Sequence, residues 1–215
     1  MMRLSILTNN SSWFNKYANE LQFQLQGMGH VVSLINKRSD INNGEICFIL
    51  SFSKILNKTH LNKNKNNIVV HASDLPKGRG FSPMQWAILN GDNEIILTLF
   101  EAVEELDAGP YFFKDQIIFN GYELYEEMRE IIGNKIVEMC IKYVCSQKSL
   151  KANNQQGTES YYNKRTLSDD EIDPSKSIKE QFNHFRIADN KNFPLYFYYN
   201  GQKYYIKISR DQSNE

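Results

Sequence analysis

The run EICFILSF, residues 45–52, is the feature of this sequence that most constrains its fold. It is apolar at nearly every position, whereas a strand with one face in water alternates apolar and polar residues. A continuous apolar strand is typical of a parallel sheet that is covered on both faces. Similar runs at 3–8, 30–35 and 68–71 accompany a helix predicted over 14–28, where apolar residues recur at spacings of three and four. This pattern predicts an α/β fold with a mostly parallel sheet and flanking helices.

The polar stretch 146–157 divides the chain into two predicted parts. We expect a core domain over residues 1–150 and a short C-terminal subdomain over residues 151–215, with a helix and a β-hairpin. The turn Asn200-Gly201 between aromatic residues is a strong hairpin signal. The other predicted elements are a helix at 84–89, strands at 94–103 and 111–119, a helix at 122–145, a helix face that includes residues 178, 182, 185 and 188, and hairpin strands at 195–199 and 203–209.

Composition argues against several classes of protein. The 25 basic and 25 acidic residues give a net charge of zero, so we expect no DNA partner, whereas a small anionic ligand held by one or two cations stays open. The apolar runs are too short to span a bilayer and the N-terminus lacks the apolar core of a secretory signal, so we expect a cytoplasmic protein without a membrane span. Three cysteines without a CxxC pair, and no histidine pair at metal-ligand spacing, predict neither a disulfide nor a metal site. The aromatic hairpin could pair with a second chain and give a homodimer.

Three of the predicted strands end in polar residues. These ends lie at residues 8–10, at 51–54 and at His71. Because open α/β sheets bind ligands at the carboxyl ends of their strands, we expect the three segments to meet in one crevice.

His71 stands where an apolar strand gives way to a loop that contains Pro76, Gly78 and Gly80. A lone histidine beside an apolar run is more often structural than catalytic. Its place at a strand end, and the backbone amides and two cations of residues 73–80, favour a catalytic role here. A plain surface turn remains the alternative for this loop.

Asp107 lies in the acidic segment ELDAGP, about one helix and one strand after His71. An adjacent strand could bring its carboxylate beside the ring, where it would fix the tautomer and stabilise the protonated form. The spacing permits this arrangement without showing it, and a simple turn is the alternative.

Two motifs together are similar to a known family. The segments HASDLPKGRG at 71–80 and SPMQWAILNG at 82–91 resemble the signature of the folate-dependent formyltransferases, and ELDAGP at 105–110 resembles that family's second motif at a matching distance. The likeness covers residues 2–119 and resumes at 161–166 (YYNKRT). It implies a Rossmann-like formyltransferase core followed by the small C-terminal appendage.

The resemblance implies an activity and two catalytic residues. Family members move a formyl group from N10-formyltetrahydrofolate to an amine, which attacks the formyl carbon and gives a tetrahedral intermediate. His71 would manage the proton transfer and Asp107 would orient the ring. The family keeps an asparagine two residues before the histidine, where this chain has Val69. We favour Ser73 as the replacement donor over Asn67, because Asn67 is expected at the start of the strand.

The resemblance also implies ligand contacts by position. Lys77, Arg79, Lys164 and Arg165 would meet a diphosphate, although a solvated surface pair is the alternative for the last two. Asp74 would contact the attacking amine or cap its own turn. The residues expected to line the folate site are Ser51, Phe52, Leu75, Trp86, Val103, Glu104, Glu105 and Leu106, and those expected on the acceptor side are Asn9, Asp74, Lys77, Gly78, Arg79, Gly80, Lys164 and Arg165.

The expected acceptor follows from differences between branches of the family. Methionyl-tRNA formyltransferases carry a larger C-terminal domain and a basic surface, and purine-pathway members do not usually show the YYNKRT-like stretch. We therefore expect the sugar N-formyltransferase branch, which formylates nucleotide-linked amino sugars for surface glycans such as lipopolysaccharide. Formylation of an aminoacyl-tRNA or of a carrier-bound aminoacyl group is the alternative enzyme. A non-catalytic folate- or nucleotide-binding module is the alternative class, because of Val69.

Overall fold

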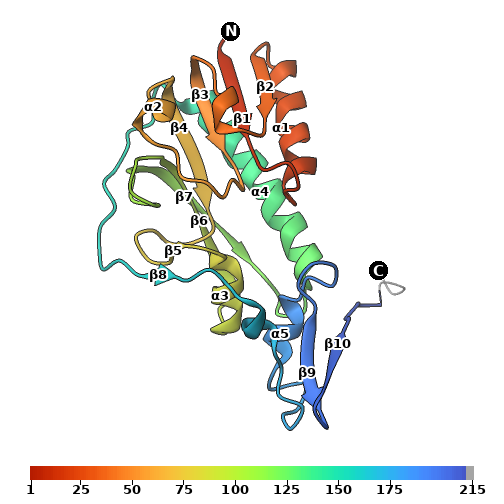
Figure 1. Cartoon of the computed structure of the whole chain (residues 1–215). Helices are drawn as coiled ribbons and strands as arrows, with labels where there is room; N and C mark the ends of the chain where they lie inside the picture. The colour runs from red at the N-terminus through yellow and green to blue at the C-terminus, as the bar shows by residue number, and fades with distance from the viewer. Residues whose placement is uncertain (212–215) are drawn as a thin grey trace.

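A six-stranded sheet forms the centre of the molecule (Figure 1). The computed structural model describes residues 1–211. The strands, in the spatial order β2-β1-β3-β4-β6-β7, are β1 (Arg3–Leu7), β2 (Val31–Ile35), β3 (Gly44–Ile49), β4 (Asn64–His71), β6 (Glu94–Glu101) and β7 (Tyr111–Ile118). The first four pair in parallel, while β6 is antiparallel to both of its neighbours. The predicted α/β fold with a mostly parallel sheet is confirmed.

Both faces of the sheet are buried, which accounts for the continuous apolar run in β3. Ile6 and Phe48 belong to the large core between the sheet and two helices, α1 (Asn15–Gly27) and α4 (Tyr125–Ser146). The alternate residues Leu7, Cys47 and Ile49 are buried in a second cluster on the opposite face. A strand with apolar neighbours on both sides needs apolar residues at successive positions. None of the helices in the described residues is long and apolar enough to cross a membrane.

Helices α1 and α4 pack closely against each other. A Cβ atom at Gly133 of α4 would lie 2.5 Å from ring atoms of Tyr17 of α1. The glycine, which weakens a helix when considered alone, is therefore required by the close approach of the tyrosine ring.

Most predicted elements differ from the structure by a few residues at their ends, and two of the differences have a clear cause. β4 begins at Asn64, four residues earlier than predicted, because the polar side chains of its first half have partners: Asn66 donates to Glu101, and Asn67 donates to the carbonyl of Leu61. Asn67 therefore lies inside the strand and not at its start. The predicted C-terminal helix is shorter, since α5 comprises Phe182–Arg186 only.

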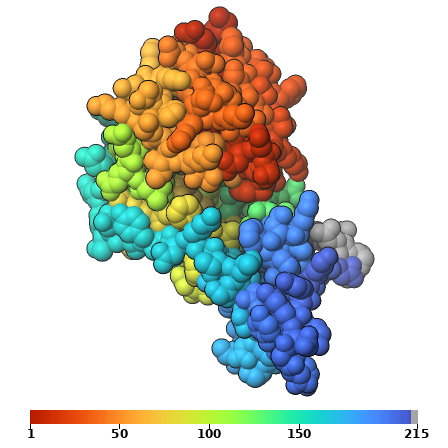
Figure 2. Space-filling model, in the orientation of Figure 1, coloured from red at the N-terminus to blue at the C-terminus, as the bar shows by residue number. Residues whose placement is uncertain are grey.

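Residues 151–163, here called the strap, run along the outside of the molecule after α4 (Figures 1 and 2). Within the strap, β8 (Tyr161–Tyr162) pairs with β5 (Arg79–Gly80), and Asn153 pairs with Tyr111 of β7. The strap therefore belongs spatially to the sheet domain. The division of the chain at residue 150 stays a prediction, which a separate small cluster around Phe185 and Leu195 supports.

The C-terminal hairpin is formed by β9 (Leu195–Tyr199) and β10 (Gln202–Ile206), as predicted. Several of its aromatic side chains are exposed, namely Tyr198, Tyr199, Tyr204 and Tyr205. The remaining elements are short: α2 (Lys58–Leu61), α3 (Pro83–Leu89), η1 (Arg38–Asp40) and η2 (Leu167–Asp170). A homodimer through the hairpin stays a prediction.

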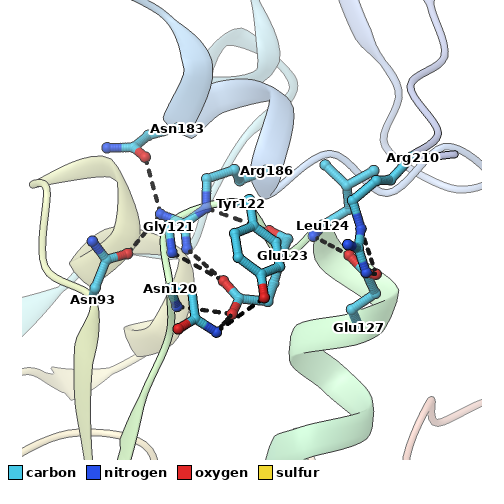
Figure 3. A network of polar contacts seen from close by, with 10 residues as sticks. All are labelled: Asn93, Asn120, Gly121, Tyr122, Glu123, Leu124, Glu127, Asn183, Arg186 and Arg210. Atoms are coloured by element: carbon cyan, nitrogen blue, oxygen red, sulfur yellow. Dashed lines mark hydrogen bonds and ion pairs between the residues drawn. The ribbon is translucent and has the colours of Figure 1, made fainter. Parts of the chain in front are cut away.

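Arg186 joins α5 to the sheet domain (Figure 3). Its side chain is only 2% exposed, and its Nη2 atom lies 3.6 Å from the carboxylate of Glu123. The guanidinium donates hydrogen bonds to the side-chain carbonyls of Asn93 (2.8 Å) and Asn183 (3.2 Å). The Glu123 carboxylate in turn accepts from the backbone N–H of Asn120 at 2.8 Å. The two buried charges, on Arg186 and Glu123, are therefore paired with each other. Next to it, Arg210 binds Glu127 at the start of α4.

Arg186→Met should destabilise the protein by about 3–5 kcal/mol, because it leaves the buried Glu123 carboxylate without its cation. The measurement is the free energy of unfolding from urea denaturation. Lys16→Met is the matched control, since the Lys16–Glu130 pair is exposed and pairs of that kind contribute about 1 kcal/mol or less. Equal stability losses in the two variants would contradict the assignment of Arg186 as the anchor of α5.

Candidate functional site

The carboxyl ends of β1, β3 and β4 meet at one edge of the sheet. Asn9, which follows β1, donates its side-chain amide to the carbonyl of Ser51 (3.0 Å) and to the hydroxyl of Ser53 (3.3 Å), which follow β3. The last residue of β4 is His71, and all four residues line one cavity. The expected convergence of the three strand ends is confirmed.

His71 is nearly buried and has two neighbours that define its state. Its Nε2 atom lies 2.8 Å from the carbonyl oxygen of Gly78. Because a carbonyl only accepts hydrogen bonds, Nε2 carries the hydrogen, and in the neutral ring Nδ1 keeps its lone pair. That Nδ1 lies 3.8 Å from Oδ2 of Asp107. This distance is too long for a hydrogen bond, so the carboxylate faces Nδ1 without bonding to it.

Asp107 is held in place from two sides. Its Oδ2 atom accepts a hydrogen bond from the backbone N–H of Gly80 (2.9 Å). Its backbone carbonyl, with that of Gly109, accepts from the side-chain amide of Gln155 in the strap, at 2.8 Å each. The residue adopts a positive φ of 51°, which is uncommon for a residue with a side chain. The structure thus brings together His71 and Asp107, the pair that sequence spacing permits.

The strap also fixes the loop after His71. Gly80 has a φ of +102°, and a Cβ atom there would lie 2.4 Å from the carbonyl oxygen of Tyr162. The same carbonyl accepts from the N–H of Phe81 (3.1 Å), and the N–H of Arg79 donates to the carbonyl of Ser160 (2.9 Å). Glycine is required at position 80 because no side chain fits between the loop and the strap.

Arg79, predicted to meet a diphosphate, is buried, with its side chain 8% exposed. It connects the strap to the loop that carries Asp107. Its guanidinium donates to Glu159 (2.7 Å), Gln155 (2.9 Å), the hydroxyl of Tyr161 (3.1 Å) and Glu105 (3.3 Å). With four partners within the protein, this cation supports the geometry of the loop.

A cavity of about 250 Å³ opens on one side of His71. Its walls are largely apolar and include Phe52, Val69 and Phe100. Of the residues predicted to bind folate, those that line this cavity are Ser51, Phe52, Val103, Glu105 and Leu106. His71 and Asp107 also line this cavity.

Three of the residues predicted to bind folate lie outside this cavity lining. Leu75 is 1% exposed and packs inside the protein. Trp86 donates its indole N–H to the carbonyl of Asn163 and stacks on Tyr162. Glu104 accepts a hydrogen bond from the backbone N–H of Lys58. These contacts hold the strap and the loops around the cavity, and direct folate contact by the three residues stays a prediction.

A second cavity of about 370 Å³ is also lined by His71. Its lining includes Asn9, Trp13 and Gln85, and the N-terminal half of α4 contributes Tyr125 and Arg129. Burial raises the pKa of the Tyr125 phenol, whose oxygen accepts a hydrogen bond from Gln85, so the group is neutral at physiological pH. The residues that line both cavities are Ser51, Phe52, Ser53, Val70, His71, Gly80 and Phe81. His71 therefore stands where the two cavities join.

Most of the residues predicted on the acceptor side have other surroundings. Asp74 pairs with Lys114 and Arg165 with Asp170. Gly78 supplies the carbonyl that orients His71. Asn9 and Gly80 line the second cavity, whereas Asp74, Lys77, Gly78, Arg79, Lys164 and Arg165 line neither cavity.

The serine expected to replace the missing asparagine is turned away from the cavities. The Ser73 hydroxyl is buried without a hydrogen-bond partner in the described part of the chain, and its carbonyl accepts from Thr98 (2.7 Å). Val69, at the asparagine's position, lines the first cavity with an apolar side chain. Neither Ser73 nor Asn67 lines a cavity that His71 lines.

Sequence reasoning missed several residues of the site. Tyr125 and Arg129 are one helical turn apart, and this spacing could have placed them on one face of α4. Ser53 lies in the strand end 51–54 that the sequence places at the crevice, but the sequence gives it no role of its own. Gln155 lies in a polar stretch that carries no local signal, and only its contacts with the Asp107 loop reveal its role.

Methionyl-tRNA formyltransferases are similar to this chain in sequence. The protein from Lactococcus lactis subsp. lactis is 28% identical over 173 residues, which cover 77% of this chain and 53% of that protein. The protein from Thermotoga neapolitana is 31% identical over 103 residues, which cover 47% of this chain and 33% of that protein. The chain thus spans between a third and about half of the length of these relatives.

Several solved structures share the fold. A methionyl-tRNA formyltransferase from Clostridium thermocellum matches with a TM-score of 0.84 at 20% identity, over 100% of this chain and 96% of that one. HypX from Aquifex aeolicus, in complex with tetrahydrofolic acid, matches with a TM-score of 0.81 at 17% identity, over 94% of this chain and 36% of that one. A 4-N formyltransferase from Francisella tularensis matches with a TM-score of 0.71 at 17% identity, over 98% of both chains. The expected formyltransferase fold is confirmed.

The family described as formyl transferase matches residues 33–144, which is more than half of the chain. The matched range includes the end of β4 with His71, the loop that follows it and the segment that carries Asp107. The chain therefore belongs to the formyl transferase family.

Proposed function

We propose that this protein transfers a formyl group from N10-formyltetrahydrofolate to a primary amine. The observation that carries the proposal is the position of His71, which lines two cavities at once and has a basic nitrogen beside a carboxylate. A direct transfer between two bound molecules needs a site for each of them beside the residue that moves the proton. The first cavity would hold the folate and the second the acceptor amine.

The first cavity fits the pterin end of a folate. Phe52 and Phe100 line it with apolar side chains suited to a flat ring, and the backbone of residues 102, 103 and 105–107 would offer donors and acceptors to the ring's polar edge. HypX, whose fold this chain shares, is a protein seen in complex with tetrahydrofolic acid. When bound, the folate supplies the formyl group to the amine.

His71 would act first as a base and then as an acid. Its Nδ1 takes the proton that the amine loses as the amine nitrogen bonds to the formyl carbon. Asp107, 3.8 Å from Nδ1, stabilises the resulting imidazolium. His71 then returns the proton to N10 as the bond between N10 and the formyl carbon breaks, so that the ring ends in its starting state.

For the acceptor we propose a nucleotide-linked amino sugar, in the synthesis of a surface glycan. The second cavity offers polar groups and an aromatic face to a sugar, from Asn9, Gln85 and Trp13. Arg129 supplies the one permanent cation of this lining, and it is shared with two carboxylates, Glu126 at 3.2 Å and Asp189 at 3.5 Å. A phosphate would therefore compete with these carboxylates for Arg129. The likeness to the 4-N formyltransferase fold extends over nearly the whole of both chains.

Charged tRNA is a second candidate acceptor. The observation in its favour is that the curated relatives named above are methionyl-tRNA formyltransferases. A third candidate, a folate-binding module without transferase activity, draws its support from Val69, which has no polar atom to offer at the asparagine's position.

His71→Ala should lower kcat for formyl transfer by about 10²- to 10⁴-fold, the contribution typical of a positioned base, and leave folate affinity within about threefold. The assay follows release of tetrahydrofolate, with folate affinity from tryptophan fluorescence. His30→Ala is the control, because His30 precedes β2 and lines neither cavity. Undiminished transfer by His71→Ala would refute the assignment of the base.

An acceptor panel separates the three candidate functions. Nucleotide-linked 3-amino and 4-amino sugars, charged methionyl-tRNA and a carrier-bound aminoacyl group are each incubated with N10-formyltetrahydrofolate. We expect turnover with at least one amino sugar and none with tRNA, because the second cavity is compact and the chain has no net positive charge. Turnover with tRNA alone would replace the sugar as acceptor, and folate binding without any turnover would indicate the binding module.

A further inference from the structure

A formyl-transfer site needs a hydrogen-bond donor for the negative charge that develops on the formyl oxygen. Removing one such donor typically lowers kcat by about 10²- to 10³-fold. Val69 supplies no polar atom, and Ser73 and Asn67 line neither cavity. The question, which rests on the proposed function, is which group of this chain provides the donor.

The donor must lie within reach of the place where the two cavities join, because the formyl carbon is bonded on one side and attacked from the other. At this junction the backbone N–H groups of Gly80 and Phe81 are already bonded, to Asp107 and Tyr162 respectively. The ring of His71 is already assigned to the proton transfer. The neutral side-chain donors of the junction are the hydroxyls of Ser51 and Ser53.

The side-chain amide of Asn9 distinguishes Ser53 from Ser51. It donates to the hydroxyl oxygen of Ser53 at 3.3 Å and to the backbone carbonyl of Ser51 at 3.0 Å. A hydroxyl that accepts from an amide keeps its own hydrogen for another acceptor. The second bond holds Ser51, whose φ of 52° is uncommon for a residue with a side chain. Asn9 thus orients one hydroxyl and fixes the loop that carries it.

The loop of Ser53 also leaves the sheet beside the position of the missing asparagine. Ile49, the last residue of β3, pairs with Val69 of β4. Residues 51–53 therefore start next to Val69 and reach the same cavity from the neighbouring strand.

We propose that Ser53 donates its hydroxyl hydrogen to the formyl oxygen, in place of the asparagine that Val69 replaces, and that Asn9 is the residue that positions it. Ser53 would be a catalytic residue, since it touches the reacting group. The donor would have moved from β4 to the end of β3, with His71 and Asp107 unchanged.

The first test measures binding and does not depend on the acceptor. The probes are 10-formylfolate and folate, which differ only in the formyl group. Ser53→Ala should weaken binding of 10-formylfolate by about two- to tenfold, as expected for one hydrogen bond, and leave binding of folate unchanged. Ser53 is exposed, so the substitution does not threaten folding. Ser39→Ala, at an exposed serine that bonds to Asp40, is the matched control and should change neither affinity.

The second test measures turnover with an acceptor that the panel identifies. Ser53→Ala should lower kcat by about 10²-fold with little change in KM, Ser53→Thr should retain most of the activity, and Asn9→Ala should lower kcat less than Ser53→Ala. Adding Val69→Asn to Ser53→Ala should restore at least tenfold, because it returns a donor to β4. If Ser53 only supported the structure of its loop, an asparagine on β4 would not restore the activity of Ser53→Ala.

The outcomes separate this inference from the proposed function. If the wild-type protein transfers the formyl group and Ser53→Ala matches it in both tests, the donor assignment is overturned while the function stands. A loss in Ser53→Ala that Val69→Asn does not reduce also overturns it. A wild-type protein that binds neither folate probe overturns both proposals.

Discussion

The hydrogen bond from the backbone of Gly80 to the carboxylate of Asp107 joins the two motifs of the site. Without it, the acidic loop and the loop after His71 would be separate surface turns, which is what each motif alone allows. The bond can form because Gly80 has no side chain and the strap presses against it, with the carbonyl of Tyr162 at the place a Cβ would take. The distance between Asp107 and His71 therefore depends on a strand pairing formed some eighty residues further along the chain.

Arg79 extends the same arrangement. Its buried guanidinium binds Glu159 and Gln155 from the strap and Glu105 from the acidic loop. Gln155 then holds the backbone on both sides of Ala108. The sequence predicts that the charge of Arg79 binds a ligand. In the structure it binds groups within the protein and thereby fixes the position of Asp107. The second cavity consequently has little positive charge, which limits how strongly it can attract an anionic acceptor.

The parts of the fold that follow from local patterns could be predicted from the sequence. The continuous apolar run of β3 indicated a sheet buried on both faces. The neighbouring strand β1 shows this burial, because its successive residues Ile6 and Leu7 belong to clusters on opposite faces. The place of His71 at a strand end could be predicted because the apolar run of β4 stops at this residue. The start of β4 was not, because Asn66 and Asn67 look like loop residues until their partners, Glu101 and the carbonyl of Leu61, are known.

The contacts of side chains that meet across long sequence distances could not be predicted. Ser73 follows His71 by two residues, and only the path of the loop shows that its hydroxyl is turned inward. The burial of Arg79 depends on strap residues such as Gln155 and Glu159, for which the sequence carries no periodic or motif signal. The two cavities are formed by loops that follow different strands. No single segment of the sequence therefore predicts them or the place where they join.

Helix α4 has a further consequence through its contact with α1. The ring of Tyr17 lies against Gly133, so α4 cannot slide along α1 without a clash. The part of α4 around and before this contact forms one wall of the second cavity, through Tyr125, Arg129, Ile132 and Ile136. New side chains at these wall positions would therefore change which acceptor fits the second cavity, without touching the edge of the sheet that carries His71 and Asp107.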